Sequence, residues 1–277
     1  MSSAGPYEPP ESALLLLGPG DRRLVLNRRG STVWEVRTEL GPYAVKVGYP
    51  TGTHAWTALA PAREAAVLRH LTSERVLNGE WERGTWSAQP WRTGQSLYEL
   101  WKPHRIDTGP PTPDLTEALS CALALAALHE KGWVHGDVQP AHFVMGRSAG
   151  TFLIDLALAR GGRIPRAYDF PYRGCLVHYE APEISASVLE SGTAVPTREA
   201  DVYALGASLF ISATGWRHVA YPDDAPREIQ RQAVVKGPHR PVNLPGVLGA
   251  LLPRMLSAAP ADRPTSTEVC DALAHAL

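Results

Sequence analysis

Short apolar runs separated by turn-forming residues fill the first third of the chain and predict β-strands. Strand-like runs lie at residues 13–17, 23–26, 32–37, 43–47, 76–77 and 86–89. One helix is predicted over residues 61–71, because Glu64, Val67 and Leu71 share a face at three- and four-residue spacing. This part of the chain therefore predicts a small β-rich body with a single helix.

Helices are predicted to dominate from residue 93 onward. A long apolar stretch runs from Pro113 to Lys131, after Thr112 as a capping residue. Residues 121–128 are apolar on every side, so this helix is expected to be buried. A second apolar helix is predicted over residues 201–214, where Gly215 follows as a stop signal.

These patterns predict an α+β fold in two parts. The first part spans residues 12–92 and the second spans residues 93–277. Residues 1–11 are rich in Pro, Ser and Glu and are expected to form a flexible tail.

Composition narrows the classes of function. The 277 residues carry 27 Lys and Arg against 28 Asp and Glu, which gives a net charge of −1 and argues against a nucleic-acid partner. The three cysteines form no CxxC pair, which argues against a structural zinc site and favours a reduced, cytoplasmic setting. No signal peptide or membrane association is expected, since the apolar runs at 13–17 and 202–211 are too short to span a bilayer.

Lys46 and Glu64 are the first candidate pair. Glu64 lies on the apolar face of the predicted helix, where an unpaired carboxylate would be unfavourable. Lys46 lies on a preceding strand between Val45 and Val47, and strand alternation turns its side chain away from both valines. The residues alone leave two interpretations open, a buried ion pair or two unrelated surface charges.

Two aspartates accompany apolar strands further along the chain. Asp137 lies in a His-Gly-Asp turn soon after the buried helix, a location that suits a catalytic base. Asp155 ends the apolar run at residues 151–154. Taken singly, such an aspartate is more often a turn former or a helix cap. Together the two supply an oxygen donor for a metal and an acceptor for a hydroxyl proton, as a nucleotide–magnesium site requires.

Six short motifs in this order resemble those of the eukaryotic-type Ser/Thr protein kinase family. They are YAVK at 43–46, HGDVQPAHF at 135–143, IDLA at 154–157, EAPE at 180–183, ADVYALGASLF at 200–210 and ADRPT at 261–265. Each motif is weak alone, but the ordered set over about residues 20–275 is specific. The resemblance implies a bilobal protein-kinase-like fold, with a small β-rich N-lobe carrying one C helix and a larger, mainly helical C-lobe.

The resemblance also implies roles for individual residues. Lys46 would bind the α- and β-phosphates of ATP and pair with Glu64, which favours the ion-pair interpretation. Asp137 would be the catalytic base and Asp155 the metal-binding carboxylate. The arginine of ADRPT, Arg263, would pair with Glu183.

Two segments resemble nucleotide-binding parts of the family only loosely, the hinge and the glycine-rich turn. The hinge is expected near Gln89 and Trp91, although packing at the interface between the lobes is another interpretation of Trp91 and the nearby Trp86. The turn at 28–33 has one glycine where the family has three, so the phosphate contacts of this turn would fall to Gly30, Ser31, Arg28 or Arg29. A plain polar hairpin turn is the alternative.

Three further positions depart from the family pattern. His142 replaces a metal-binding asparagine, and imidazole suits softer metals than magnesium, so either the second metal is lost or manganese is favoured. A structural histidine is the other interpretation. Gly136 replaces an arginine that often receives an activation-segment phosphate, so that switch is not expected here. Gln139 replaces a lysine that neutralises γ-phosphate charge, which removes an electrostatic contribution.

The sequence therefore predicts an ATP-dependent Ser/Thr kinase-like phosphotransferase with ATP and Mg²⁺ or Mn²⁺ as cofactors. The EAPE segment and the helix after it favour a protein or peptide substrate. The His-Gly-Asp form also resembles stand-alone bacterial kinase homologues that modify precursor peptides. The alternatives are a pseudokinase acting as a nucleotide-binding scaffold or regulator, and a small-molecule phosphotransferase. A partner protein is expected to regulate the chain, because no sensor segment follows the kinase-like region.

Overall fold

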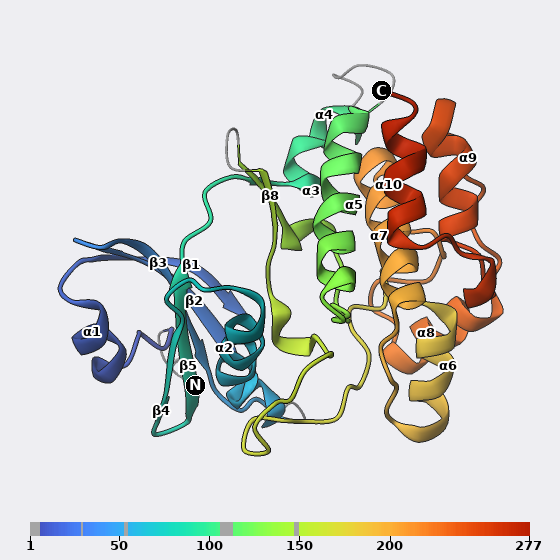
Figure 1. The fold of residues 1–277 in the computed structure, drawn as a ribbon. Coiled ribbons are helices and arrows are strands. Elements are labelled where there is room, and N and C mark those ends of the chain that lie inside the picture. The colour runs from blue at the N-terminus through green and yellow to red at the C-terminus, as the bar shows by residue number, and fades with distance from the viewer. Residues whose placement is uncertain (1–5, 29, 53–54, 106–112, 147–149) are drawn as a thin grey trace. The chain divides into compact units, whose positions relative to one another are not determined.

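The computed structural model describes residues 6–28, 30–52, 55–105, 113–146 and 150–277, which form two compact units (Figure 1). The first unit takes in the chain up to Arg92 together with Leu156–Leu158 and Gly162–Phe170. The second takes in Thr93–Asp155, Ala159–Gly161 and Pro171–Leu277. The predicted α+β class is confirmed, since strands dominate the first unit and helices the second.

The first unit is built on a five-stranded antiparallel sheet in the order β1-β2-β3-β5-β4. Its strands are β1 (Asp21–Arg28), β2 (Ser31–Thr38), β3 (Gly41–Gly48), β4 (Leu77–Trp81) and β5 (Gly84–Pro90). Its helices are α1 (Glu11–Leu17) and α2 (Ala60–Leu71), with 3-10 turns η1 (Ala55–Ala58) and η3 (Leu156–Leu158). The strands predicted between residues 23 and 89 and the helix at 61–71 are confirmed.

The prediction of a strand at residues 13–17 was wrong, because these residues belong to helix α1. Ala13 and Leu17, four residues apart, are buried in one cluster with Trp34 and Trp86 of the sheet. Short apolar runs do not distinguish strand from helix, and the leucines here favour helix once an i, i+4 face can be buried. Gly18, at φ 85°, then ends the helix.

The described part of the segment before α1 lies against the sheet. The main-chain oxygen of Tyr7 accepts hydrogen bonds from Thr32 Oγ1 at 2.7 Å and from Trp34 Nε1 at 3.0 Å. The Tyr7 ring packs at a tilt against Tyr49 and Trp81. Residues 6–10 therefore contribute to the packing of the first unit.

The second unit is mainly helical and carries a small sheet in the order β6-β7-β8. The strands are β6 (Gln95–Ser96), β7 (Phe143–Gly146) and β8 (Gly150–Leu153). The α-helices are α3 (Leu97–Leu100), α4 (Lys102–Arg105), α5 (Leu115–Glu130), α6 (Pro182–Ser191), α7 (Arg198–Thr214), α8 (Arg227–Lys236), α9 (Gly246–Met255) and α10 (Ser266–Ala274). The 3-10 turns are η2 (Pro140–His142) and η4 (Pro260–Asp262).

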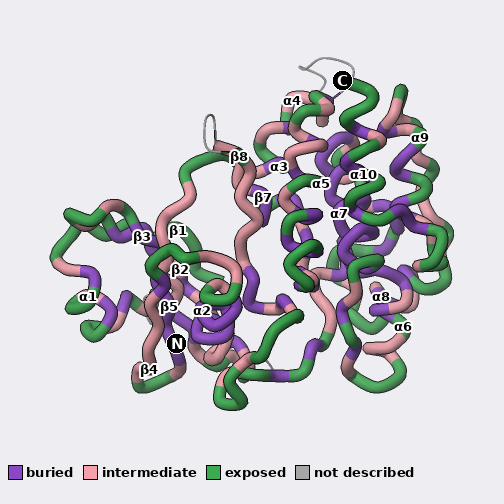
Figure 2. Tube along the Cα trace, viewed as in Figure 1, coloured by how far each residue is buried: buried purple, intermediate pink, exposed green. Residues whose placement is uncertain are grey.

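Both predicted apolar helices are present, with corrected starts. Helix α5 is capped by Asp114, whose side chain accepts from Thr116 N, whereas the expected cap Thr112 lies outside the described residues. Helix α7 begins three residues earlier than expected because Thr197 caps it, accepting from Ala200 N. Figure 2 shows α7 buried over most of its length, as its apolar sequence predicts. Within the described ranges, no helix combines the length and apolarity needed to cross a membrane.

Acidification is expected to destabilise the second unit through His218. Its buried ring stacks on His239 at a centroid distance of 4.6 Å. Burial, followed by the charge of His239, lowers the pKa of His218 to about 4. An unfolded histidine titrates near pH ~6.5. The unfolded state therefore binds more protons between these values, and the free energy of unfolding decreases as the pH falls through this window.

The variant His218→Phe separates this effect from the other titrating groups. Denaturant unfolding at neutral pH and near pH ~4.5 should show wild type losing about 2 kcal/mol more stability than the variant. Equal losses in the two proteins would contradict a neutral, buried His218.

Candidate active site

Lys46 and Glu64 form a buried ion pair within the first unit. Lys46 Nζ lies 2.8 Å from Glu64 Oε1 and 2.7 Å from Oε2. The two side chains are 12% and 2% exposed, so the charges are almost wholly removed from water. The interpretation as two unrelated surface charges is therefore ruled out. Glu64 Oε1 also accepts from Leu156 N at 3.3 Å, which ties α2 to the residue that follows Asp155 in the sequence.

Arg63, next to Glu64 on α2, is a structural residue that the sequence patterns did not single out. It is 2% exposed, donates to Ala157 O at 2.5 Å, and lies 3.5 Å from Asp169 Oδ1. Its guanidinium also lies over the Phe170 ring at 5.2 Å. The sequence could have indicated this role, because an arginine on an apolar helix face is expected to be buried and a buried guanidinium must be paired.

The turn between β1 and β2 has a structural reason for its glycine. Gly30 has φ 84°, and a Cβ there would overlap Thr57 and Tyr49 O. Its carbonyl accepts from Tyr49 N at 2.8 Å. Ser31 is the first residue of β2 and pairs with Arg28, while Arg29 lies outside the described residues. Close packing thus explains Gly30 before any phosphate is considered.

The expected hinge residues lie at the end of β5. Gln89 pairs with Ala44 of β3, and Trp91 N donates to Pro42 O at 2.9 Å. Because the N–H of Trp91 is engaged and Pro90 has none, an adenine contact at Pro90 or Trp91 would have to use a carbonyl. Trp86, 1% exposed, packs in the core of the first unit and donates to Ser12 Oγ.

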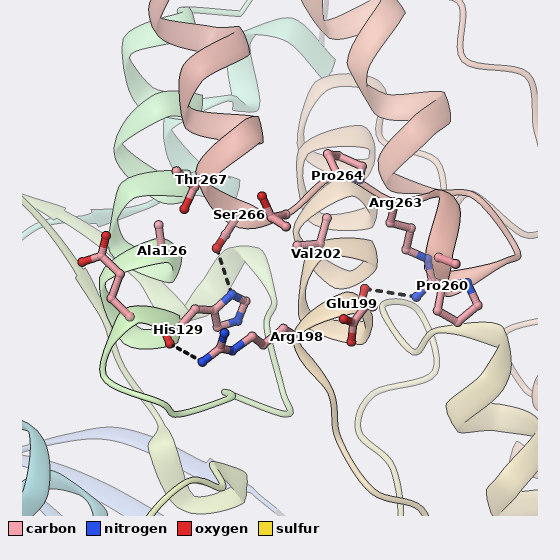
Figure 3. A pocket seen from close by; sticks show the side chains of 13 residues that line it. Ala126, His129, Arg198, Glu199, Val202, Pro260, Arg263, Pro264, Ser266 and Thr267 are labelled. Atoms are coloured by element: carbon pink, nitrogen blue, oxygen red, sulfur yellow. Dashed lines mark hydrogen bonds between the residues drawn. The ribbon is translucent and has the colours of Figure 1, made fainter.

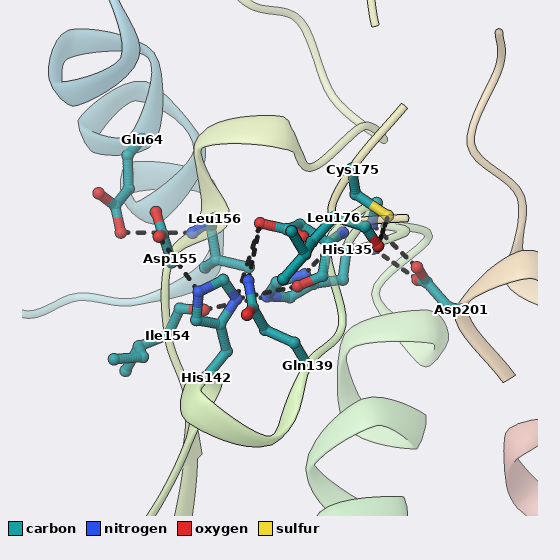
Figure 4. Close-up of polar contacts among 12 residues, drawn as sticks. Glu64, His135, Gln139, His142, Ile154, Asp155, Leu156, Cys175, Leu176 and Asp201 are labelled. Carbon is teal, nitrogen blue, oxygen red and sulfur yellow. Dashed lines mark hydrogen bonds and ion pairs between the residues drawn. The ribbon is translucent and has the colours of Figure 1, made fainter. Parts of the chain in front are cut away.

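In the second unit, Asp201 of α7 holds the loop that carries Asp137 (Figure 4). It accepts from His135 N at 2.6 Å and from Gly136 N at 2.9 Å. Asp201 is 2% exposed, and His129 Nε2 lies 3.1 Å from Oδ2, the oxygen that accepts from His135 N. The sequence placed Asp201 only at a helix start. A carboxylate in an otherwise apolar helix was the signal for this role.

His135 fixes the loop from the other side. Its Nε2 lies 3.0 Å from Ile154 O, and its Nδ1 accepts from Asp137 N at 3.2 Å. A carbonyl can only accept, so Nε2 carries the hydrogen and the ring is neutral. Burial, followed by the charge of His142, lowers the pKa of His135 to about 4, in agreement with that neutral form.

Asp137 presents a largely buried carboxylate. Its side chain is 17% exposed, and Oδ2 accepts from Gln139 Nε2 at 3.3 Å. Oδ1 is buried, and the main chain of Leu176 interacts with the carboxylate. Burial raises the pKa of Asp137 to about 7, against the lowering effect of His142. Such a carboxyl can take up a proton near neutral pH.

His142 lies between the two candidate aspartates. Its Nδ1 donates to Asp137 O at 2.9 Å, and its Nε2 lies 3.3 Å from Asp155 Oδ2. Burial alone would lower the pKa of His142, but the hydrogen bond to Asp155 and the charges of both aspartates raise it. The protonated ring, which donates from both nitrogens, is therefore favoured.

Asp155 is the one non-glycine residue with positive φ, 63°, in the described part of the chain. A non-glycine residue in this region is uncommon and marks strain of functional interest. Its side chain is 41% exposed, so the carboxylate is accessible to a cation.

The oxygen donors of Asp155 fit one hard cation. Magnesium is commonly bound by one or two carboxylates together with substrate phosphates, and Asp155 supplies such an oxygen. A protonated imidazole cannot be a ligand, so His142 could join only after losing a proton. Among the residues that the structure describes, no group of three or more His, Cys, Asp or Glu is arranged to hold a metal. Asp155 would thus hold a metal jointly with a bound nucleotide.

Two ion pairs fix the first turn of α6 and the segment before it. Arg263 forms two hydrogen bonds with the Glu183 carboxylate, at 2.7 and 2.8 Å, as the sequence predicted. Glu180 forms a second pair with Arg231 of α8, at 2.7 and 3.0 Å, which the sequence did not indicate. Buried charges in such pairs hold a segment in one geometry, because losing either partner leaves the other unmatched.

A cavity of about 460 Å³ lies among α5, α7 and α10 of the second unit (Figure 3). His129 lies in its wall and bonds Ser266 Oγ at 2.9 Å, while Arg198 donates to His129 O. These two contacts use polar groups of the wall to hold α5, α7 and α10 together.

The fold and the paired acidic and basic residues define a protein-kinase-like protein, and comparison with known proteins agrees. No protein-family model matches the chain. The chain is 30% identical over 175 residues to the serine/threonine-protein kinase PkaA of Streptomyces coelicolor, which covers 60% of this chain and 30% of that protein. It is 31% identical over 186 residues to PknK of Mycobacterium tuberculosis, covering 64% of this chain and 15% of that kinase. PknJ of the same species is 27% identical over 161 residues, covering 55% and 26%.

The chain is therefore a divergent relative of the serine/threonine protein kinases. The aligned parts cover 30% or less of the length of these relatives. The family resemblance drawn from six motifs is confirmed.

Proposed function

We propose that the chain transfers the γ-phosphoryl group of ATP to a serine or threonine hydroxyl of a protein or peptide. The observation that carries this proposal is Asp137, a largely buried carboxyl on a loop fixed by Asp201 and His135, with a pKa that burial raises to about 7. A substrate hydroxyl would donate a hydrogen bond to this carboxylate. The naming of the aligned relatives as serine/threonine kinases supports the same chemistry.

Each candidate residue has a separate role in the proposed reaction. Asp137 orients the acceptor hydroxyl and takes its proton as the oxygen–phosphorus bond forms. The bond between the γ-phosphorus and the β–γ bridging oxygen breaks, and ADP leaves with that oxygen. Lys46, held by Glu64, binds the α- and β-phosphates. A magnesium or manganese ion at Asp155 would neutralise phosphate charge.

Several residues fill secondary roles in this proposal. Gln89 and Trp91 would contact adenine through the main chain, and Gly30 and Ser31 would lie near the phosphates. His142 would either ligate a second metal, which favours manganese, or remain a cation beside Asp155. A polypeptide acceptor is favoured because ion pairs of Glu180 and Glu183 fix the segment before α6 and the first turn of that helix. A precursor peptide is one form of such an acceptor, and a regulatory partner protein is part of the proposal.

A nucleotide-binding pseudokinase is the second candidate. It is favoured by the contact between His142 and Asp155, which engages the metal carboxylate, and by Gln139 in place of the charge-neutralising lysine. In that case ATP would bind and raise the melting temperature without any transfer.

Phosphoryl transfer from γ-labelled ATP tests the proposal. The full chain would be incubated with magnesium or manganese and peptide pools that offer Ser, Thr or Tyr as the only acceptor. Label in Ser or Thr peptides, located by mass spectrometry, is the expected result. Thermal stabilisation by ATP without label in any pool would support the pseudokinase instead. Equal rates with the two metals would count against a manganese preference.

A further inference from the structure

The activation segment, residues 156–183, contains no serine or threonine. A Ser/Thr kinase therefore has no residue of its own acceptor type there. Gly136 also leaves the loop without the arginine that could bind a phosphate. Phosphorylation of a serine or threonine therefore cannot order this segment.

Tyr172 makes the direct link between this segment and the catalytic loop. Its hydroxyl donates to Gly136 O at 2.7 Å, and the residue is 4% exposed. A buried hydrogen bond of this length is well formed, and burial raises the pKa of Tyr172 well above its ordinary value, so the hydroxyl keeps its proton.

The bond acts on the peptide group that joins Gly136 to Asp137. Tyr172 holds the oxygen of that peptide, and His135 Nδ1 accepts from its nitrogen at 3.2 Å. The preceding peptide is held by Asp201, which accepts from Gly136 N. Two consecutive peptide groups before Asp137 are thus held by hydrogen bonds. The activation segment supplies one of these bonds, through Tyr172.

Glu180 and Arg231 hold the rest of the segment. Arg231 donates to both oxygens of Glu180 and also to Arg173 O at 3.1 Å. Glu180 accepts in addition from Cys175 N at 2.9 Å and from Ser185 Oγ at 2.7 Å. A carboxylate of the segment, paired with an arginine of α8, thus provides a permanent charge contact without any modification.

We propose that Tyr172 is a positioning residue, which orients Asp137 through Gly136 and, with the Glu180–Arg231 pair, replaces activation-segment phosphorylation. This inference rests on the proposed function, because it takes Asp137 as the base. The kinase would then be active as synthesised.

The variant Tyr172→Phe removes only the hydroxyl. Steady-state kinetics with ATP and an acceptor peptide should show kcat reduced about tenfold with KM for ATP unchanged, since one hydrogen bond that orients the base is lost. Hydrogen exchange of the peptide spanning residues 134–139 should be faster than in wild type. Tyr203→Phe is the matched control, a buried tyrosine of α7 whose hydroxyl faces His218 at 3.5 Å, and it should change neither quantity.

The exchange measurement separates this inference from the proposed function. Faster exchange at residues 134–139 in Tyr172→Phe supports the contact even if wild type transfers no phosphate, which would overturn only the proposed function. Unchanged exchange and unchanged kcat would overturn the inference while leaving the function intact.

Mass spectrometry of the purified, active chain supplies the second test. No phosphate should be found in residues 156–183, and phosphatase treatment should leave kcat unchanged. Loss of activity on removal of a phosphate from Tyr168, Tyr172 or Tyr179 would overturn the proposal.

Discussion

Asp137→Asn is expected to abolish measurable phosphoryl transfer while the chain stays folded and binds ATP. The amide matches the carboxylate in shape and can still accept from Gln139, but it cannot take the proton of an acceptor hydroxyl. Loss of a general base typically reduces the rate by about 10²–10⁴-fold. The rate of label transfer at saturating ATP measures this, with calorimetry to show that ATP affinity is kept.

Asp271→Asn is the matched control, because Asp271 is exposed on α10 and the same charge is removed there. Its rate should equal that of wild type. Transfer by Asp137→Asn at more than about a third of the wild-type rate would show that another group takes the proton.

Lys46→Met should have the largest effect on stability and should also weaken ATP binding. Glu64 is 2% exposed, and two donors to its carboxylate were described above, Lys46 Nζ and Leu156 N. Removing the ammonium takes away the charged one and leaves the carboxylate buried. Breaking a buried pair in this way costs about 3–5 kcal/mol. Denaturant unfolding followed by tryptophan fluorescence would measure the loss.

The double variant Lys46→Met/Glu64→Gln separates structure from function. It should recover most of the lost stability, because no unmatched charge is buried, while ATP binding stays weak. Arg22→Met is the control for an exposed pair, since Arg22 and Glu8 are 39% and 63% exposed, and it should cost at most about 1 kcal/mol. If the double variant were as unstable as Lys46→Met, the burial argument would be contradicted.

The sequence predicted the elements and charges that follow local rules. The strand alternation around Lys46 and the helix spacing of Glu64 each fixed a side-chain direction, and both residues met as expected. The Glu183–Arg263 pair followed from ordered motifs rather than from local rules. These features could be found because each rests on a periodicity or on a motif with a physical role.

Contacts made by tertiary packing could not be found in this way. Tyr172 and Gly136 are 36 residues apart, and Glu180 and Arg231 are 51 apart, with no periodicity that connects either pair. Helix α1 was mistaken for a strand because its apolar face is defined only by the sheet that buries it. The orientation of His142 toward Asp155 likewise depends on the fold, since its motif gives a position and no partner.

Under the proposed function, Lys46 and Asp155 would both contribute to binding an ATP–metal complex. Titration calorimetry of ATP with magnesium into wild type, Lys46→Met and Asp155→Asn tests it most directly. We expect one ATP per wild-type chain, and an affinity at least about tenfold weaker in each variant, because each loses a charged contact to phosphate or metal. Wild-type affinity in both variants, or no ATP binding by wild type, would contradict the account.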